Sequence, residues 1–276
     1  MKTFTRGALR ALCGIAVAPV YLSPVLAQDR TQTLSSDDYL AYLITLAAPQ
    51  ESSKGSASTV GIPSGFSLPH GAGFIAGALS DARREAAGTK GGNDADGSAA
   101  LGLGFGDAKN AIGVEVLLSL ESVDPSDFAD SGSFHLKFSH QLPSILPGEV
   151  AAVAIGASNL GAWGDSSARD KSYYLAASTT FSVSNLPGLM SAGYSTAIGT
   201  GDQDEGGFIG IGLGLTDWLS VGTSWSGNEA IVGVTTTTKM FNAYDIQVGL
   251  SYGDVTHNGS DGRWTLSVAI IDLDLF

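Results

Sequence analysis

The stretch Phe208 to Trp225, FIGIGLGLTDWLSVGTSW, alternates large apolar residues with glycine and constrains the fold more than any other part of the chain. Isoleucine or leucine occupies every second position from Ile209 to Leu215, and a glycine lies at each position between. After the polar pair Thr216-Asp217 the alternation resumes as far as Trp225. Because successive side chains of a β-strand point to opposite faces, the stretch predicts a hairpin with one apolar face and one nearly bare face.

The first 27 residues have the features of a secretory signal peptide. A basic start is followed by an apolar run from Leu12 to Val25 and by a small-x-Ala sequence that ends at Ala27. This order predicts export and removal of residues 1–27. The alternative, a membrane-anchoring helix, is disfavoured because Pro19 and Pro24 interrupt a run that is already short.

Composition excludes two kinds of chemistry from the exported chain. The single cysteine, Cys13, lies within the predicted leader, so no disulfide is expected after export. The formal charge is −13 for the whole chain and −16 without the leader, which holds three basic residues and no acidic one. Such an acidic chain offers no basic patch for phosphates, so nucleic acid is not an expected partner.

Residues 28–69 differ in composition from the rest and predict a short helix followed by a linker, both in the periplasm. The run from Ser35 to Asp38 offers helix caps, and the apolar residues from Tyr39 to Leu46 suit one amphipathic helix. From Gln50 to Pro69 the chain is rich in Ser, Gly, Pro and Thr, which is typical of a linker.

Residues 70–276 consist of about twelve alternating segments, each about nine to twelve residues long, the length that a tilted strand needs to cross a membrane. The segments are 70–80, 97–105, 111–120, 132–140, 148–157, 171–182, 189–199, 206–215, 217–226, 229–238, 241–252 and 262–273. Long polar loops and short turns alternate between most of them, and the long loops carry much of the acid. This order predicts an all-β fold, an antiparallel up-and-down transmembrane β-barrel with both chain ends on the short-turn side.

A secreted soluble β-sandwich would show the same alternation as a membrane barrel, so the composition of the two strand faces must distinguish the two folds. One face is apolar, as in the set Ile112, Val114, Val116 and Leu118. The opposite face holds mostly Gly, Ser and Ala rather than the Lys, Glu, Arg and Thr of a wetted sheet. Small residues suit the interior of a closed barrel, so the apolar face is predicted to contact lipid.

The last segment resembles the closing strand of the bacterial outer-membrane β-barrel superfamily. Its alternating residues from Trp264 to Ile270 and its final Phe276 carry the resemblance. Members commonly end in an aromatic residue that the barrel-assembly machinery reads, which implies that machinery and outer-membrane lipid as partners. The alternation slips after Ile270, since Asp272 and Asp274 fall on the lipid-facing side. A β-bulge there, or a strand end that lies beyond the hydrocarbon, would reconcile the two patterns.

Polar residues on the predicted inner face are candidates for a solute-selecting constriction: Glu115, His135, Lys137, Asp245 and Gln247. The alternative is that they pair with one another and only stabilise the barrel. Two acidic loop clusters offer oxygen ligands for weak calcium or magnesium binding: Asp94 with Asp96, and Asp202, Asp204 with Glu205. Solvated acidic loops are the simpler interpretation, and no other cofactor is expected.

No catalytic site is predicted. His257 and Ser260 lie in one loop, but near neighbours on a flexible turn do not hold a nucleophile and its base in hydrogen-bond geometry. Three functions follow from the sequence. The first is an outer-membrane channel for small solutes. The second is a non-conducting barrel whose loops or N-terminal segment bind a partner, or whose N-terminal helix plugs the lumen. The third, a secreted soluble β-sandwich, would leave no membrane role.

Overall fold

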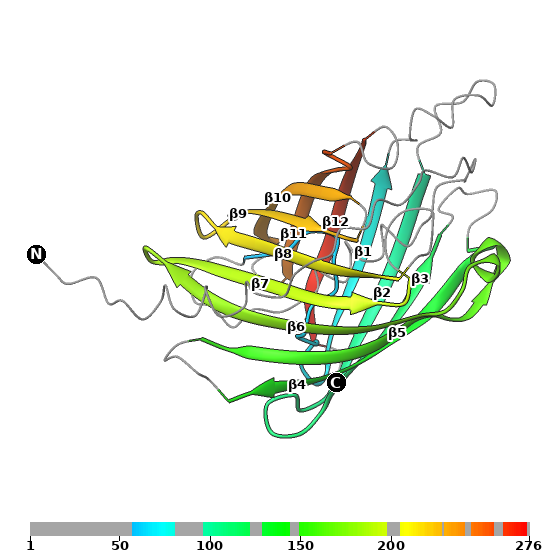
Figure 1. The fold of residues 1–276 in the computed structure, drawn as a ribbon, viewed down its shortest axis with the longest axis horizontal. Coiled ribbons are helices and arrows are strands. Elements are labelled where there is room, and N and C mark those ends of the chain that lie inside the picture. Colours follow the sequence, from blue (N-terminus) through cyan, green and yellow to red (C-terminus); the bar gives the residue numbers. More distant parts are fainter. Residues whose placement is uncertain are drawn as a thin grey trace, which may run out of the picture. The chain divides into compact units, whose positions relative to one another are not determined.

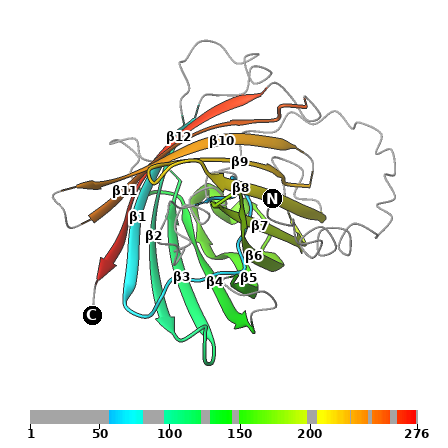
Figure 2. The ribbon, with the colours of Figure 1, turned by 90° about the vertical axis from the view of Figure 1, so that its left-hand side faces the viewer.

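The chain forms a closed antiparallel β-barrel. The computed structural model describes residues 57–80, 96–121, 129–143, 149–197, 205–227, 229–240, 244–256 and 262–274. Within these ranges twelve strands pair in chain order, and β1 pairs with β12 to close the sheet (Figures 1 and 2). The strands are β1 (Ala72–Ser80), β2 (Asp96–Gly106), β3 (Gly113–Leu120), β4 (Gly132–Leu142), β5 (Ala151–Trp163), β6 (Ser172–Val183), β7 (Leu186–Ser195), β8 (Gly206–Gly214), β9 (Leu219–Trp225), β10 (Ala230–Met240), β11 (Tyr244–Gly253) and β12 (Arg263–Asp274). The predicted barrel of about twelve strands is confirmed, and the sandwich is wrong because one sheet closes on itself.

The hairpin predicted from Phe208 to Trp225 is strands β8 and β9. Gly210 pairs with Ser224 and Ile211 with Thr223, so glycines and serines share one face. The second strand begins at Leu219, two residues later than predicted. The reason is local: the Thr216 hydroxyl oxygen accepts the backbone N–H of Leu219 at 3.0 Å and fixes the turn.

Strands β7 and β5 also differ from the prediction, at the start and at the end respectively. Strand β7 begins at Leu186 rather than 189, because Ser184 and Asn185 take positive φ values of 51° and 69° and form a two-residue turn. Strand β5 continues to Trp163 rather than 157, since register shifts between β4 and β5 let the pairing extend to Gly132.

The short turn between β2 and β3 is held by the carboxylate of Asp107. It accepts the backbone N–H groups of Lys109 at 3.0 Å and Asn110 at 3.1 Å. The side-chain amide of Asn110 donates to it at 2.6 Å. These hydrogen bonds, that from the Asn110 side chain above all, lower the pKa of Asp107.

The predicted irregularity near the end of the chain is confirmed as a register shift between β1 and β12. Ile75 pairs with Ile270, whereas Gly73 pairs with Leu273, so β12 has one more residue than β1 over this interval. Ile271 still points inward, as the buried Thr265, Ser267 and Ala269 do, and packs against the interior cluster. The bulge therefore changes the face only of the side chains that follow Ile271.

A belt of apolar side chains covers the outside of the barrel. Ile155 and Leu175 expose 59% and 56% of their surface, and the outward residues of β8 are likewise exposed. Aromatic pairs lie near one end of the strands, with ring centroids 6.0 Å apart for Phe134 and Trp163 and 4.9 Å apart for Tyr252 and Trp264. A continuous exposed belt with aromatic residues at its edge is typical of a membrane-spanning barrel.

The N-terminal leader and the helix predicted around Tyr39 to Leu46 lie outside the described residues. In the described part of the chain, no helix has the length and apolar composition needed to cross a membrane.

A charge in the apolar belt is expected to destabilise the barrel according to its depth. Ile211 lies near the middle of β8, and Leu215 follows the end of that strand. Ile211→Arg should cost about 2–4 kcal/mol of folding free energy in a bilayer, and Leu215→Arg about 0–1 kcal/mol. Urea titrations of folding into lipid vesicles check this; equal costs would contradict the placement of the belt in the membrane.

Candidate functional site: the barrel interior

The inner face of the barrel is lined mainly by glycine, alanine and hydroxyl residues. Buried serines recur on nearly every strand, and several bond across strands, as Ser178 does with Ser191 at 2.7 Å between their hydroxyl oxygens. The predicted division into lipid and lumen faces is therefore confirmed for β8 and β9, where Ile211 is exposed and Gly210 and Ser224 are buried.

Residues 57–69 lie inside this barrel, and we call them the lumen segment. They belong to no strand, yet nearly all of their side chains through Leu68 are buried. The sequence placed these residues in a linker ahead of the barrel; the structure places them against the inner faces of β2 to β10.

The lumen segment doubles back on itself. Ala57 and Phe66 pack in one cluster with Ala152 and Leu189, so the chain between them must turn. Gly61 supplies the turn with a φ of +68°, a backbone conformation that favours glycine. The segment then leaves the lumen where β1 begins, and Gly71 donates its N–H to the carbonyl of Gly104 at 3.0 Å.

The glycines of the wall fit the backbone of the lumen segment. A Cβ atom on Gly212 would lie 2.1 Å from the carbonyl oxygen of Ser58, and one on Gly222 would lie 2.5 Å from the same oxygen. A Cβ on Gly104 would lie 2.6 Å from that of Leu68. Larger residues at these positions would displace the segment, so the bare face noted in the sequence is the surface on which residues 57–69 pack.

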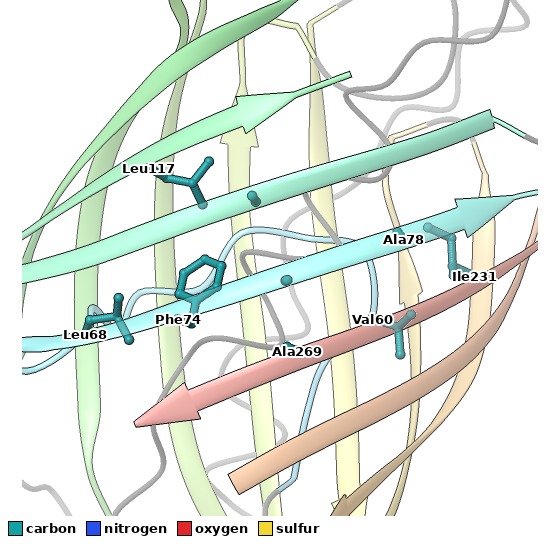
Figure 3. Packing of buried hydrophobic residues seen from close by; sticks show 9 residues of the cluster. Val60, Leu68, Phe74, Ala78, Leu117, Ile231 and Ala269 are labelled. Carbon is teal, nitrogen blue, oxygen red and sulfur yellow. The ribbon is translucent and has the colours of Figure 1, made fainter. Parts of the chain in front are cut away.

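Apolar contacts join the lumen segment to the wall. Val60 and Leu68 belong to a buried cluster with Phe74, Leu117 and Ile231 (Figure 3). A second cluster places Ile62 against inward side chains of β6 and β8. The wall therefore carries large apolar residues where it meets the segment.

Hydrogen bonds from wall serines hold the backbone of the segment. The hydroxyl oxygen of Ser178 accepts the N–H of Gly65 at 2.8 Å and lies 3.3 Å from that of Ser64. The Ser224 hydroxyl donates to the carbonyl of Val60. These bonds satisfy backbone groups that have no strand partner.

A buried ion pair meets the segment near its exit. The carboxylate of Glu115 on β3 lies 2.8 Å from Nζ of Lys137 on the neighbouring β4, and both side chains are almost fully buried. The other carboxylate oxygen accepts the N–H of Leu68 at 3.0 Å. Two of the five predicted lumen residues are thus brought together, with a main-chain partner that the sequence did not reveal.

The other three predicted lumen residues lie apart from this pair. His135 is buried on β4, and its Nε2 lies 3.1 Å from the hydroxyl oxygen of Ser119 and 3.0 Å from that of Ser133. Gln247 is buried on β11. Asp245 pairs with Lys239 at 3.1 Å near the start of β11, where the lysine is exposed.

Two further ion pairs, which the sequence analysis missed, lie at the long-loop end. Glu121 pairs with Arg169, and Glu229 pairs with Arg263 at 3.1 Å. Arg169 follows the 3-10 helix η2 (Gly164–Ala168). The partners are far apart in sequence and come together because consecutive strands pair between them, β3 to β5 for the first pair and β10 to β12 for the second.

The predicted acidic cation sites are mostly beyond the described residues, which exclude Asp94, Asp202 and Asp204. Asp96 begins β2, and Glu205 is exposed. Within the described ranges, no three His, Cys, Asp or Glu side chains are grouped to hold a metal ion. His257 and Ser260 also fall outside the described residues.

No family model and no curated protein matches the chain. Several solved structures of outer-membrane proteins are similar to it at low identity. KdgM porin in complex with disordered oligogalacturonate is 9% identical, with a TM-score of 0.49, over 72% of this chain and 98% of that one. An outer membrane channel from Pseudomonas putida F1 is 13% identical, with a TM-score of 0.44, over 74% and 97% of the two chains. The calcium-bound outer membrane phospholipase dimer of Salmonella typhi is 11% identical, with a TM-score of 0.47, over 86% and 99%. These neighbours include both channels and an enzyme, and they assign no activity to this chain.

Adding one methyl group on the inner face of β8 is expected to disturb the lumen segment. Gly212→Ala places a Cβ against the backbone of Ser58 and should cost about 1–3 kcal/mol of unfolding free energy. Gly207→Ala is the matched control on the same strand, since its Cβ would meet nothing closer than 3.7 Å. Denaturant unfolding of both variants checks this, and equal stability would contradict the packing described.

Proposed function

We propose that the protein is an outer-membrane channel for small polar solutes whose lumen is closed at rest by residues 57–69. The exposed apolar belt supports the membrane location, and a barrel of twelve strands is wider than the eight-stranded kind that side chains alone can fill. In this proposal the lumen segment acts as the gate.

The observation that carries the proposal is how the lumen segment is attached. It adds no strand to the sheet, and the described hydrogen bonds to its wall partners come largely from side chains such as Ser178 and Ser224. The segment can therefore leave without breaking any strand pairing. Its departure would expose wall hydroxyls such as those of Ser178 and Ser224, together with the apolar wall residues that pack against the segment.

The wall also suggests the class of solute. Four ion pairs join described residues, and each sets one acid against one base. In the wall, Glu115 and Lys137 cancel each other's charge among many serine hydroxyls, which favours small uncharged polar solutes over ions of one sign.

A second candidate is a non-conducting barrel that serves as an anchor. The apolar contacts of Val60, Ile62 and Leu68 favour it, because they make part of the lumen resemble a protein core. The two candidates differ in whether the segment ever leaves.

A disulfide between the segment and the wall tests the channel directly. Ser64→Cys with Ser178→Cys, in a Cys13→Ser background, replaces two hydroxyl oxygens 3.3 Å apart, a separation that a disulfide can bridge with small adjustment. We expect the oxidised protein to show no openings in a planar bilayer and the reduced protein to conduct.

The matched control is Ser178→Cys with Ser191→Cys, which crosslinks β6 to β7 within the wall. It should conduct equally whether oxidised or reduced. Equal conductance of the oxidised and reduced segment crosslink would exclude residues 57–69 as the gate. If the segment crosslink conducts in neither its oxidised nor its reduced form, and Gly212→Ala does not conduct either, the non-conducting anchor is favoured.

A further inference from the structure

We infer that Glu115 is the positioning residue that latches the lumen segment, through the hydrogen bond that its carboxylate accepts from the Leu68 backbone. The inference rests on the proposed gate and names the wall group that holds it shut.

The geometry assigns two separate tasks to the two carboxylate oxygens. Oε1 faces Lys137 across the β3–β4 pairing, in which residues 115 and 137 are directly opposite. Oε2 accepts the N–H of Leu68 at 3.0 Å. Lys137 has only donors, so it cannot replace Glu115 as the acceptor for Leu68.

The position of this contact suits a latch. Leu68 is the last buried residue of the segment, since Pro69 and His70 are exposed and β1 follows at Ala72. The hydrogen bond therefore lies where the mobile part of the gate would join the fixed sheet. Hydrogen bonds to charged acceptors are also stronger than those to the serine hydroxyls along the rest of the segment.

The stability of the wall by itself does not explain why a charged residue occupies position 115. Burying a carboxylate and an ammonium together rarely gains stability over apolar residues of similar volume. On the described wall of β3, the neighbouring inward positions are held by Gly113 and Leu117, neither of which could offer a side-chain acceptor to the segment. A paired carboxylate supplies that acceptor and keeps its own charge compensated.

Two variants distinguish the loss of the hydrogen bond to Leu68 from the loss of the ion pair with Lys137. Glu115→Met and Lys137→Met introduce the same side chain, and each leaves one buried charge of the pair without its partner. Only Glu115→Met removes the acceptor of the Leu68 N–H. Both are made in a chain carrying Cys13→Ser and the probe Thr59→Cys, because Thr59 is fully buried and its hydroxyl makes no hydrogen bond within the described residues.

The measurement is the rate at which a water-soluble maleimide labels the thiol introduced by Thr59→Cys in the folded barrel, with folding verified by the mobility of the unboiled protein on a gel. Glu115→Met should raise the labelling rate by about tenfold or more over the parent, and Lys137→Met should change it by less than about threefold. Equal increases in both variants would assign the effect to the ion pair and overturn the latch. An unchanged rate in folded Glu115→Met would overturn it as well.

Conductance is recorded separately, so the latch and the channel can fail independently. Faster labelling of Glu115→Met without conductance supports the latch and contradicts the channel. Conductance that rises while labelling stays unchanged contradicts the latch and leaves the channel standing.

Should Glu115→Met not fold, Glu115→Gln replaces it. The amide keeps an acceptor without the charge, so labelling should rise by less than tenfold; a rate equal to that of the parent would overturn the role of the charge.

Discussion

The structure depends on filling the inside of a closed sheet. A barrel of twelve strands encloses more space than its own glycines, alanines and serines occupy, and the chain uses residues 57–69 to fill part of it. The close approach of that segment requires glycine at positions such as 212 and 222, where a Cβ would strike the Ser58 carbonyl. On β8, glycines occupy the inner face at positions 210, 212 and 214, whereas Ile209 and Ile211 are exposed on the outside.

This packing gives the barrel two kinds of interior surface. Where the lumen segment passes, large side chains such as Leu117 and Phe74 share one buried cluster with Leu68 and Val60, and the wall resembles a protein core. Elsewhere hydroxyls bond to hydroxyls across strands, as between Ser119 and Ser133 at 3.1 Å. The buried charges of Glu115 and Lys137, and those of Glu229 and Arg263, lie in ion pairs, which compensates their desolvation.

The strands and their faces could be predicted because they follow from a period of two, which is a local property. The alternation from Ile209 to Leu215 gave the correct outside and inside, and the slip after Ile270 is a true register shift. The lumen segment could not be recognised in the same way, because Gly61, Pro63 and Gly65 have the composition of a linker. One signal was available: Leu117 and Tyr174 are large residues on otherwise small or polar inner faces, and both contact the segment or its cluster. The ion pairs at the long-loop end join residues about 30 to 50 positions apart, and no local pattern predicts which acid meets which base.

Hydrogen exchange at two backbone amides tests whether residues 57–69 are held inside the folded barrel. The N–H of Gly65 is bonded to Ser178 and that of Leu68 to Glu115, although neither residue belongs to a strand. Both amides should exchange far more slowly than those of an unstructured peptide, with protection approaching that of the strand amides around Leu117. Exchange of both amides at the rate of an open chain, while the strands remain protected, would contradict this placement of the segment.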